Sequence, residues 1–325
     1  MRIVFGILSS NNTDVAIQQI IDAIGSNHPI IIHHDFSKQA EFQVTGRNVH
    51  VLKDYAITSW GEWSLVDAVI KLMDYALNNI PDWDYFQLLS DTCLPIQPIS
   101  KFETYLETVK PDANISCINI VNNQLVFLSH GHRAFSSKKN ISYRLLRKIN
   151  YWSNKLRGAK GNQMVEGLTL PIYTKDNNPV IRLFTHSLQG ALLKLAQRYV
   201  NHSFANGTEC YVGSQFFGCS HAVCQAIKAW MNQYPEAVTA IQEKIIIPDE
   251  FFFQTVIGNL HLAHYESTNH LINFFDSSTG HGAELQLSDF ELLKASGKFF
   301  ARKFSKNPDD TMRLKMLDDI KRESR

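Results

Sequence analysis

The sequence lacks the features that define membrane-spanning and disulfide-stabilised proteins. No apolar run approaches the roughly 18 residues needed to cross a bilayer. The early apolar run from Ile3 to Leu8 is too short for a signal sequence and has no cleavage site after it. The five cysteines are odd in number and have no CxxC spacing, which is typical of reduced, buried thiols. These absences predict a cytoplasmic protein.

The chain also lacks an excess of charge of either sign. Its net charge is +1, so nothing drives it as a whole toward nucleic acid, and we expect no nucleic-acid partner. The local exception is residues 133–160, which contain nine Arg and Lys residues and no Asp or Glu. This stretch predicts contact with a membrane surface or a phosphorylated acceptor, although a solvated basic face explains it about as well.

The usual cofactor and metal motifs are missing. No Gly-x-Gly-x-x-Gly follows the first predicted strand and there is no Walker phosphate loop, which argues against a dinucleotide or P-loop site. The thirteen histidines show no HExxH spacing. Asp82-Trp83-Asp84 has the DxD pattern of many sugar-nucleotide transferases, but it precedes a predicted strand instead of following it. We therefore expect no cofactor and no catalytic metal.

What the sequence does contain is an alternation of strand and helix patterns. It predicts an α/β fold, in which helices flank a mostly parallel sheet, as one continuous domain. Residues 121–180 are polar and basic and predict long loops with irregular helix. Serine residues followed by acidic ones predict helix caps at Ser64, Ser100 and Ser288, and Ser220 is a further predicted cap. Strands are predicted at 2–9, 29–33, 48–52, 85–90, 115–120, 211–217 and 271–275, and helices at 17–24, 64–78, 100–109, 189–200 and after residues 220, 248, 288 and 305.

Several polar or aromatic residues fall where such a sheet binds ligands, beyond the carboxyl ends of its strands. Asp35 could accept hydrogen bonds from a nucleoside there, or cap an ordinary turn. Asp91 is the acidic residue at the end of the predicted strand 85–90. Trp60 could stack on a base, or simply pack beside Gly61.

The segment from Ile247 to Phe253 combines acidic and aromatic residues. Pro248 suits the first turn of a helix, and Asp249 and Glu250 fall at its positive end. The three phenylalanines that follow would desolvate a carboxylate and raise its proton affinity, as general-base catalysis requires. The alternative is that both acids only complement the helix terminus. Arg302 and Lys303, flanked by phenylalanines, could stabilise a diphosphate leaving group or be ordinary surface residues.

Six segments, in their order along the chain, resemble the core-2/I-branching β-1,6-N-acetylglucosaminyltransferase and peptide O-xylosyltransferase family. The resemblance extends from residue 3 to residue 305. Each motif is weak alone, and the six together are specific. They are Ile32-His33-His34-Asp35, Trp60-Gly61-Glu62-Trp63-Ser64-Leu65, Asp82 to Pro95 (DWDYFQLLSDTCLP), Gly213-Ser214-Gln215-Phe216-Phe217, Pro248-Asp249-Glu250-Phe251-Phe252 and Phe299 to Phe304 (FFARKF).

This resemblance implies a single GT-A type glycosyltransferase domain over residues 1–325. Residues 1–120 would form a nucleotide-binding half, and residues 121–325 an acceptor and catalytic half. The implied reaction is an inverting, metal-independent transfer of a GlcNAc- or xylose-like sugar from a UDP-sugar to a hydroxyl of a glycan or lipid-linked acceptor. A non-catalytic sugar-nucleotide or glycan-binding module and a retaining transferase are the alternatives.

The resemblance also assigns roles to individual residues. Glu250 matches the catalytic base, and Lys303, with Arg302 beside it, matches the diphosphate contact. The implied nucleotide contacts are Gly6, Asp35 and Trp60, and the implied donor and acceptor pocket contains Asp91, Ser214, Gln215 and Asp249.

The chain departs from the family in two ways. Residues 273–282 contain no Arg or Lys, where the branching enzymes have a second diphosphate-binding arginine. The membrane stem and many disulfides of the animal members are also missing. This predicts a bacterial-type cytoplasmic enzyme of surface polysaccharide synthesis, peripheral at the inner face of the membrane, where residues 133–160 hold it near a membrane-borne acceptor.

Overall fold

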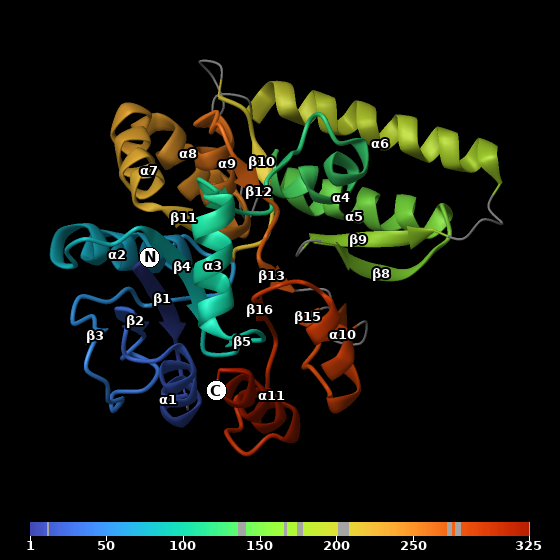
Figure 1. The fold of residues 1–325 in the computed structure, drawn as a ribbon. Helices are drawn as coiled ribbons and strands as arrows, with labels where there is room; N and C mark the ends of the chain where they lie inside the picture. Colours follow the sequence, from blue (N-terminus) through green and yellow to red (C-terminus); the bar gives the residue numbers. More distant parts are fainter. Residues whose placement is uncertain are drawn as a thin grey trace.

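A computed structural model describes residues 1–11, 13–135, 141–165, 168–173, 178–200, 208–271, 275–276 and 281–324. Its centre is a seven-stranded sheet in the order β12-β6-β11-β4-β1-β2-β3 (Figure 1). Four strands from the first hundred residues run parallel, namely β1 (Ile3–Ser9), β2 (Ile30–His34), β3 (Val49–Val51) and β4 (Tyr85–Ser90). β11 (Gly218–Ser220) is antiparallel to β4 and to β6 (Ala113–Asn114), and β12 (Tyr265–Glu266) is parallel to β6. The predicted α/β architecture is confirmed.

The two faces of the sheet follow from the alternation of side chains along β1. Gly6 lies in the middle of this strand, where an added Cβ would come within 2.6 Å of the Phe86 ring. Phe5 points to the opposite face and meets the ring of Phe300 at 6.2 Å. Packing therefore explains the glycine at position 6, and its implied role in nucleotide binding stays a prediction.

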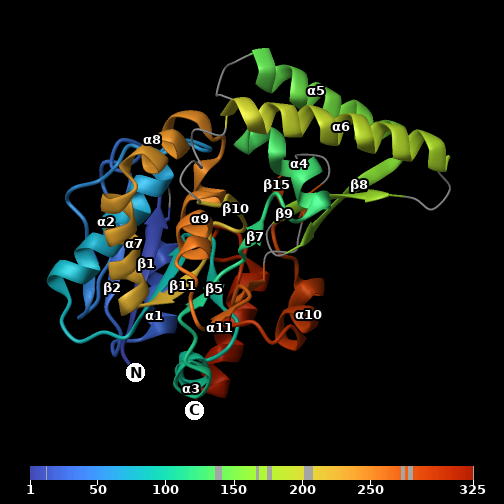
Figure 2. The same cartoon turned by 90° about the horizontal axis from the view of Figure 1, so that it is seen from above.

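Helices cover both faces of the sheet (Figure 2). On the face of Gly6, α2 (Ser64–Asn79) packs against β1 and β2 and lies beside α7 (His221–Gln233), which packs against β4 and β11. The opposite face carries α3 (Ile99–Val109), whose Phe102 meets Phe300. α1 (Asp14–Ile24) packs against α11 (Thr311–Glu323), near the C-terminal end of the chain.

The helix expected on the surface after residue 305 is partly buried. Arg313 of α11 is fully buried and donates to the carbonyl of Ala16 and the side chain of Gln19. These bonds hold α11 against α1, although the two helices lie near opposite ends of the sequence.

Smaller sheets bring distant segments together. β16 (Phe300–Ala301) lies between β13 (His270–Leu271) and β5 (Leu94–Pro95). β7 (Ile118–Asn119) pairs with β10 (Tyr211–Val212), and β14 (Phe275–Asp276) with β15 (His281–Gly282). The predicted strands 115–120 and 211–217 are therefore wrong in extent, because only Ile118–Asn119 and Tyr211–Val212 within them are strands, and these pair with each other outside the central sheet. Of the predicted strand 271–275, residues 272–274 lie outside the described residues.

Residues 121–180 are more regular than the sequence predicts. They form α4 (Gln124–Ala134), α5 (Ile141–Leu156) and a hairpin of β8 (Ala159–Val165) and β9 (Leu168–Tyr173). α6 (Pro179–Val200) begins ten residues before the helix expected at 189. α4 packs against α5, α6 and β9, so these elements form a helical lobe beside the sheet (Figure 1).

The remaining helices are short. They are α8 (Pro235–Lys244), α9 (Phe252–Asn259), α10 (Phe290–Ala295) and the 3-10 helices η2 (Pro248–Glu250) and η3 (Leu287–Asp289). Over the described residues, no helix is both long and apolar enough to cross a membrane. The division near residue 120 stays a prediction, although β11 and β12 from the second part complete the sheet of the first.

Candidate active site

Backbone hydrogen bonds bring three of the sequence motifs to one place. The amide of Gly213 donates to the carbonyl of Glu250 at 3.0 Å, and the amide of Ile247 donates to the carbonyl of Gly61 at 3.3 Å. The ring of Trp63 meets Phe252 edge-on at 5.0 Å. The segments 60–65, 213–217 and 247–252 therefore surround Glu250, although they are far apart in the sequence.

The helix predicted after residue 248 divides in two, because the acidic pair lies in the 3-10 helix η2 and α9 begins only at Phe252. Pro248 opens η2, and Ile247 before it adopts a left-handed conformation with φ of 60°. The three phenylalanines 251–253 are fully buried and anchor the start of α9. This anchoring fixes the backbone of Asp249 and Glu250 while their side chains face different surroundings.

Glu250 is held by a basic residue from the helical lobe. Its Oε2 accepts from Nη1 of Arg133 at 2.7 Å, and 26% of the Glu250 side chain stays exposed. Arg133 lies in the last turn of α4, and its carbonyl accepts from the amide of Ile246 at 3.3 Å. Burial raises the pKa of Glu250, and the charge and hydrogen bond of Arg133 oppose that rise. The result is an oriented, partly desolvated carboxylate.

Asp249 is more deeply buried than its neighbour. Its side chain is 6% exposed, and its Oδ1 has no hydrogen-bond partner among the described residues. Burial, and then the charge of Glu250, raises the pKa of Asp249 to about 7, against the opposing charges of Arg133 and Arg302. The two adjacent carboxyl groups therefore differ in burial and in partner.

Arg302 and Lys303 follow β16 and have separate surroundings. The guanidinium of Arg302 lies 4.5 Å from the centre of the Phe216 ring, and within the described chain its buried Nε has no hydrogen-bond partner. Its charge acts on Asp249. Lys303 is half-buried, with Nζ 3.8 Å from Oε1 of Glu284. The structure thus places Arg302 close to the acidic pair, and the diphosphate role of Lys303 stays a prediction.

A second cluster lies at the carboxyl ends of β1 and β4. Asp91 pairs with Nζ of Lys306 at 3.0 Å, and Ser10 bonds to both, at 3.4 Å and 3.2 Å. The amide of Phe304 donates to the carbonyl of Thr92 at 2.9 Å and holds the two segments together. Lys306 was not among the expected site residues, although it stands three positions after Lys303.

The expected nucleotide contacts differ in accessibility. Asp35 is fully buried, and its oxygens accept from the amides and hydroxyls of Ser37 and Thr58 and lie 3.3 Å from Nζ of Lys38. Burial acts to raise the pKa of Asp35, but these hydrogen bonds outweigh it and hold the pKa well below its usual range. This geometry favours the alternative in which Asp35 caps an ordinary turn. Trp60 is 72% exposed, as stacking on a base requires.

The Gly213 to Phe217 segment forms a wall beside Glu250. An added Cβ at Gly213 would lie 1.7 Å from the carbonyl oxygen of Ser116, so only glycine fits. Ser214 is buried, its Oγ accepts from the amide of Phe216 at 3.2 Å, and its carbonyl accepts from the side chain of Gln254. Gln215 is half-buried. Their contact with donor or acceptor stays a prediction.

The DxD pattern lies away from this site. Oδ2 of Asp84 accepts from the amide of Arg2 at 2.7 Å, at the amino end of β4. In the part of the chain that the structure describes, no three His, Cys, Asp or Glu side chains are grouped to bind a metal ion. Metal independence itself stays a prediction.

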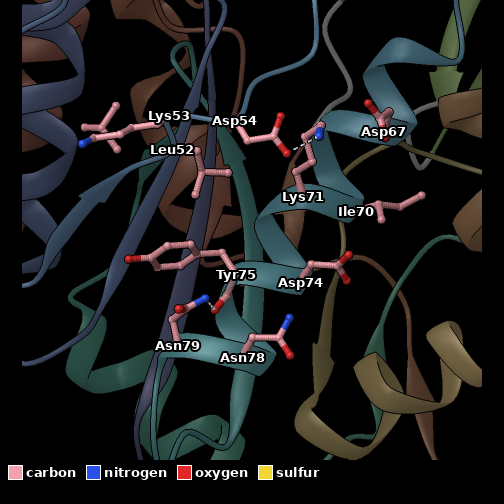
Figure 3. A pocket seen from close by; sticks show the side chains of 11 residues that line it. Leu52, Lys53, Asp54, Asp67, Ile70, Lys71, Asp74, Tyr75, Asn78 and Asn79 are labelled. Carbon is pink, nitrogen blue, oxygen red and sulfur yellow. Dashed lines mark hydrogen bonds and ion pairs between the residues drawn. The ribbon is translucent and has the colours of Figure 1, made fainter.

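A separate surface pocket of about 580 Å³ lies between β3 and α2 (Figure 3). Lys71 and Asp54 form an ion pair of 2.6 Å across it, and Tyr75 and Asn79 line its other end. None of the candidate site residues lines this pocket, so it is not part of the site around Glu250.

Comparisons with known proteins agree with the motifs. Residues 26–167 match the sequence model of the Core-2/I-Branching enzyme family. Curated protein sequences give no match. Among solved structures, mouse xyloside xylosyltransferase 1 has a TM-score of 0.33 and 8% identity, covering 93% of this chain and 97% of its own. A protein described as a glucose-1-phosphate thymidylyltransferase from Bacillus anthracis has a TM-score of 0.31 and 10% identity, covering 91% and 95%. These two similarities are too low to support an argument. Residues 26–167 of this chain are therefore similar to the Core-2/I-Branching enzyme family, and this similarity supports a glycosyltransferase.

Proposed function

We propose that this protein is an inverting, metal-independent glycosyltransferase of surface polysaccharide synthesis. It moves a GlcNAc- or xylose-like sugar from a UDP-sugar to a hydroxyl of a glycan or lipid-linked acceptor. The observation that supports this proposal most strongly is the Glu250–Arg133 pair at the junction of three family motifs. A carboxylate that is oriented, partly desolvated and still a quarter exposed is suited to take a proton from a bound hydroxyl.

In this mechanism Glu250 removes the proton of the acceptor hydroxyl as its oxygen attacks the anomeric carbon. Attack comes from the face opposite UDP, which inverts the configuration at that carbon. The burial that raises the pKa of Glu250 increases its affinity for this proton. General-base assistance of this kind contributes roughly 10²–10⁴-fold to the rate.

The departing diphosphate needs positive charge as its bond to the sugar breaks. We assign this role to Lys303 and Arg302, which lie next to each other on the segment after β16. Loss of one preorganised charge contact of this type costs roughly 10²–10³-fold in rate. The buried Nε of Arg302, which has no hydrogen-bond partner among the described residues, supports a role in binding an anionic group.

Asp35 contributes to donor binding through the loop that it organises. Its carboxylate accepts from both the amide and the hydroxyl of Thr58, two residues before the exposed ring of Trp60. We assign uridine stacking to Trp60 and the ordering of its loop to Asp35. Replacement of Asp35 would then weaken nucleotide binding through the loop.

The general-base assignment is tested by comparing two neighbouring carboxylates. Glu250→Gln is expected to lower kcat by at least 10²-fold and to leave UDP affinity within about threefold of the wild type. Glu243→Gln, an exposed glutamate of α8, is the matched control and should keep full activity. Asp249→Asn separates the two acids: if it abolishes transfer while Glu250→Gln is active, Asp249 is the base.

A donor screen and a chelator test the remaining parts of the proposal. Transfer from a UDP-sugar with inversion at the anomeric carbon should persist in EDTA. Complete loss that Mn²⁺ restores would show that a metal is needed, and a product of retained configuration would exclude the inverting mechanism. Binding of UDP-sugars with neither transfer nor hydrolysis would instead indicate a non-catalytic sugar-nucleotide-binding module.

A further inference from the structure

The helical lobe carries a large apolar surface that no part of the described chain covers. A groove of about 650 Å³ runs between α5 and α6. Val180 and Phe184 on α6 are 71% and 66% exposed, far more than a packed helix face leaves open. The other residues that line the groove are Leu145, Lys148, Ile149, Trp152, Ser153, Leu156, Ile181, Thr185 and Leu188.

The charge of the same two helices has one sign only. α5 and α6 together contain seven Arg and Lys residues and no Asp or Glu. The chain has 32 basic and 31 acidic residues, so the remainder carries a net charge of −6. The basic residues are Arg144, Arg147, Lys148, Lys155, Arg182, Lys194 and Arg198. The near-neutral total charge therefore hides two strongly basic helices, of which Lys148 lines the groove and Lys155 lies beside Trp152.

The border of the groove has the residue types that favour a membrane interface. The exposed rings of Tyr151 and Trp152 lie edge to face, with centroids 5.7 Å apart. Nζ of Lys155 lies 5.3 Å from the centre of the Trp152 ring. Amphipathic rings and long cationic side chains of this kind bridge the headgroup and acyl layers of a bilayer.

We propose that the face formed by α5 and α6 docks on an anionic lipid bilayer. The side chains of the groove enter the boundary between headgroups and acyl chains, and Lys148 in the groove and Lys155 beside Trp152 contact the lipid phosphates. A second copy of the chain is a weaker candidate, because a symmetric dimer would place these two basic surfaces against each other.

This docking face is connected to the candidate active site through one helix. α4 packs against both α5 and α6 and ends next to Arg133, whose guanidinium binds Glu250. Figures 1 and 2 show α5 and α6 on the outside of the lobe, away from the central sheet. Docking would therefore bring the site near a lipid-linked acceptor, a consequence that rests on the proposed function; the docking itself does not.

The test is binding of the full-length protein to vesicles, measured by co-sedimentation. Vesicles of equal parts phosphatidylglycerol and phosphatidylcholine should bind it at least tenfold more tightly than phosphatidylcholine alone. The double variant K148Q/K155Q should reduce binding to the anionic vesicles roughly 30-fold, and added salt should mimic this loss. V180S/F184S should reduce it at least tenfold.

Matched controls remove the same chemistry elsewhere on the surface. R47Q/K53Q removes two exposed basic residues near β3, and L292S removes an exposed leucine of α10; both should bind like the wild type. Far-UV circular dichroism checks that all variants are folded. The proposal is overturned if wild-type protein shows no preference for anionic vesicles, or if V180S/F184S converts a dimer to a monomer without changing vesicle binding. Glu250→Gln must still bind vesicles, so this test does not depend on the proposed chemistry.

Discussion

Two opposing influences set the proton affinity of Glu250. Burial disfavours its charged form, and the guanidinium of Arg133 at 2.7 Å favours it. A base needs enough affinity to take a proton, but it must also be ionised at the working pH. Arg133 therefore has two effects in the proposed mechanism, since it orients the carboxylate and keeps it ionised.

Replacement of Arg133 should shift the pH dependence of the reaction. In Arg133→Gln the charge that lowers the pKa of Glu250 is gone, so the acid limb of kcat/KM should move to higher pH. The activity loss is then larger at pH 6 than at pH 8. Arg133→Lys keeps the charge and should shift the limb less. An unchanged acid limb in Arg133→Gln would mean that Arg133 does not control the base.

Asp249 should make the stability of the fold depend on pH. Its folded-state pKa of about 7 lies above the ordinary value of about 3.9, so the folded protein binds this proton more tightly than the unfolded chain. The free energy of unfolding then falls as pH rises from about 4 to about 7. Asp249→Asn should remove this contribution and gain about 2 kcal/mol more, relative to wild type, at pH 8 than at pH 5.

Urea unfolding at the two pH values measures this difference. Asp22→Asn, which changes an exposed aspartate of α1, is the control and should show no such pH dependence. If Asp249→Asn destabilises the protein equally at both pH values, the buried carboxyl group is ionised in the folded state and the assignment of its proton is wrong.

The acidic part of the site can be predicted from the sequence, and its basic partner cannot. Glu250 stands in a local motif with a proline and three phenylalanines, which together fix a helix start. Arg133 lies 117 residues away and is the first member of an acid-free basic stretch, so its pattern indicates a surface. Only the packing of α4 against the Ile246 backbone brings it to Glu250. The Lys306–Asp91 pair cannot be predicted from the sequence either, because the two residues come together only through the pairing of β16 with β5.

At the scale of elements, the early strands and helices were predictable, but in the helical lobe only the second half of α6 was. β1, β2 and β4 are mostly apolar, and each is buried along most or all of its length. α5 and α6 leave many apolar side chains exposed and mix them with basic ones, which resembles a loop rather than a helix facing a core. Their helical form depends on mutual packing with α4, which no local pattern shows.

Helix caps, too, can be predicted only in part from local sequence patterns. Ser220 accepts from the amide of Val223 at 3.3 Å and caps α7 as predicted. Ser64 and Ser100 instead lie inside the first turns of α2 and α3, and neither helix has a side-chain cap. At the third predicted box, Gln286 and Asp289 exchange the reciprocal bonds in place of Ser288. A serine before an acidic residue does not fix where the helix begins, because Pro98 and Trp63 start these helices one or two residues earlier.

Ser220, which caps α7, can be compared directly with Ser100, which the sequence predicts as a cap of α3 but which caps nothing. Ser220→Ala should lower the free energy of unfolding by about 1 kcal/mol, because an amide at the start of α7 loses its acceptor. Ser100→Ala, the matched serine that caps nothing, should change it by less than about 0.5 kcal/mol. Urea unfolding monitored by circular dichroism measures both. Equal effects would show that the bond from Val223 to Ser220 contributes nothing.

At the scale of the whole molecule, the two predicted halves of the chain share one central sheet. β11 lies between β4 and β6, so a strand from residues 218–220 separates two strands from the first 120 residues. Without β11 from the second half, β4 and β6 of the first half would each lose a paired neighbour. The helical lobe, in contrast, meets the rest of the chain through the bonds of Arg133 to Ile246 and Glu250 and through packing of β8 against β14, and its outer helices keep exposed apolar faces.

This arrangement predicts a hierarchy of opening that hydrogen exchange can measure. Amides of β4 and β11 should exchange only through global unfolding and with the same free energy, because each strand bonds to the other. Amides of α5 should exchange through smaller local openings, since most side chains of that helix are exposed. Anionic vesicles should slow exchange in α5 and α6 selectively, while a UDP-sugar should protect residues near Glu250. If β11 exchanged at a much lower free energy than β4, the two halves would be separate folding units and the single-domain prediction would be wrong.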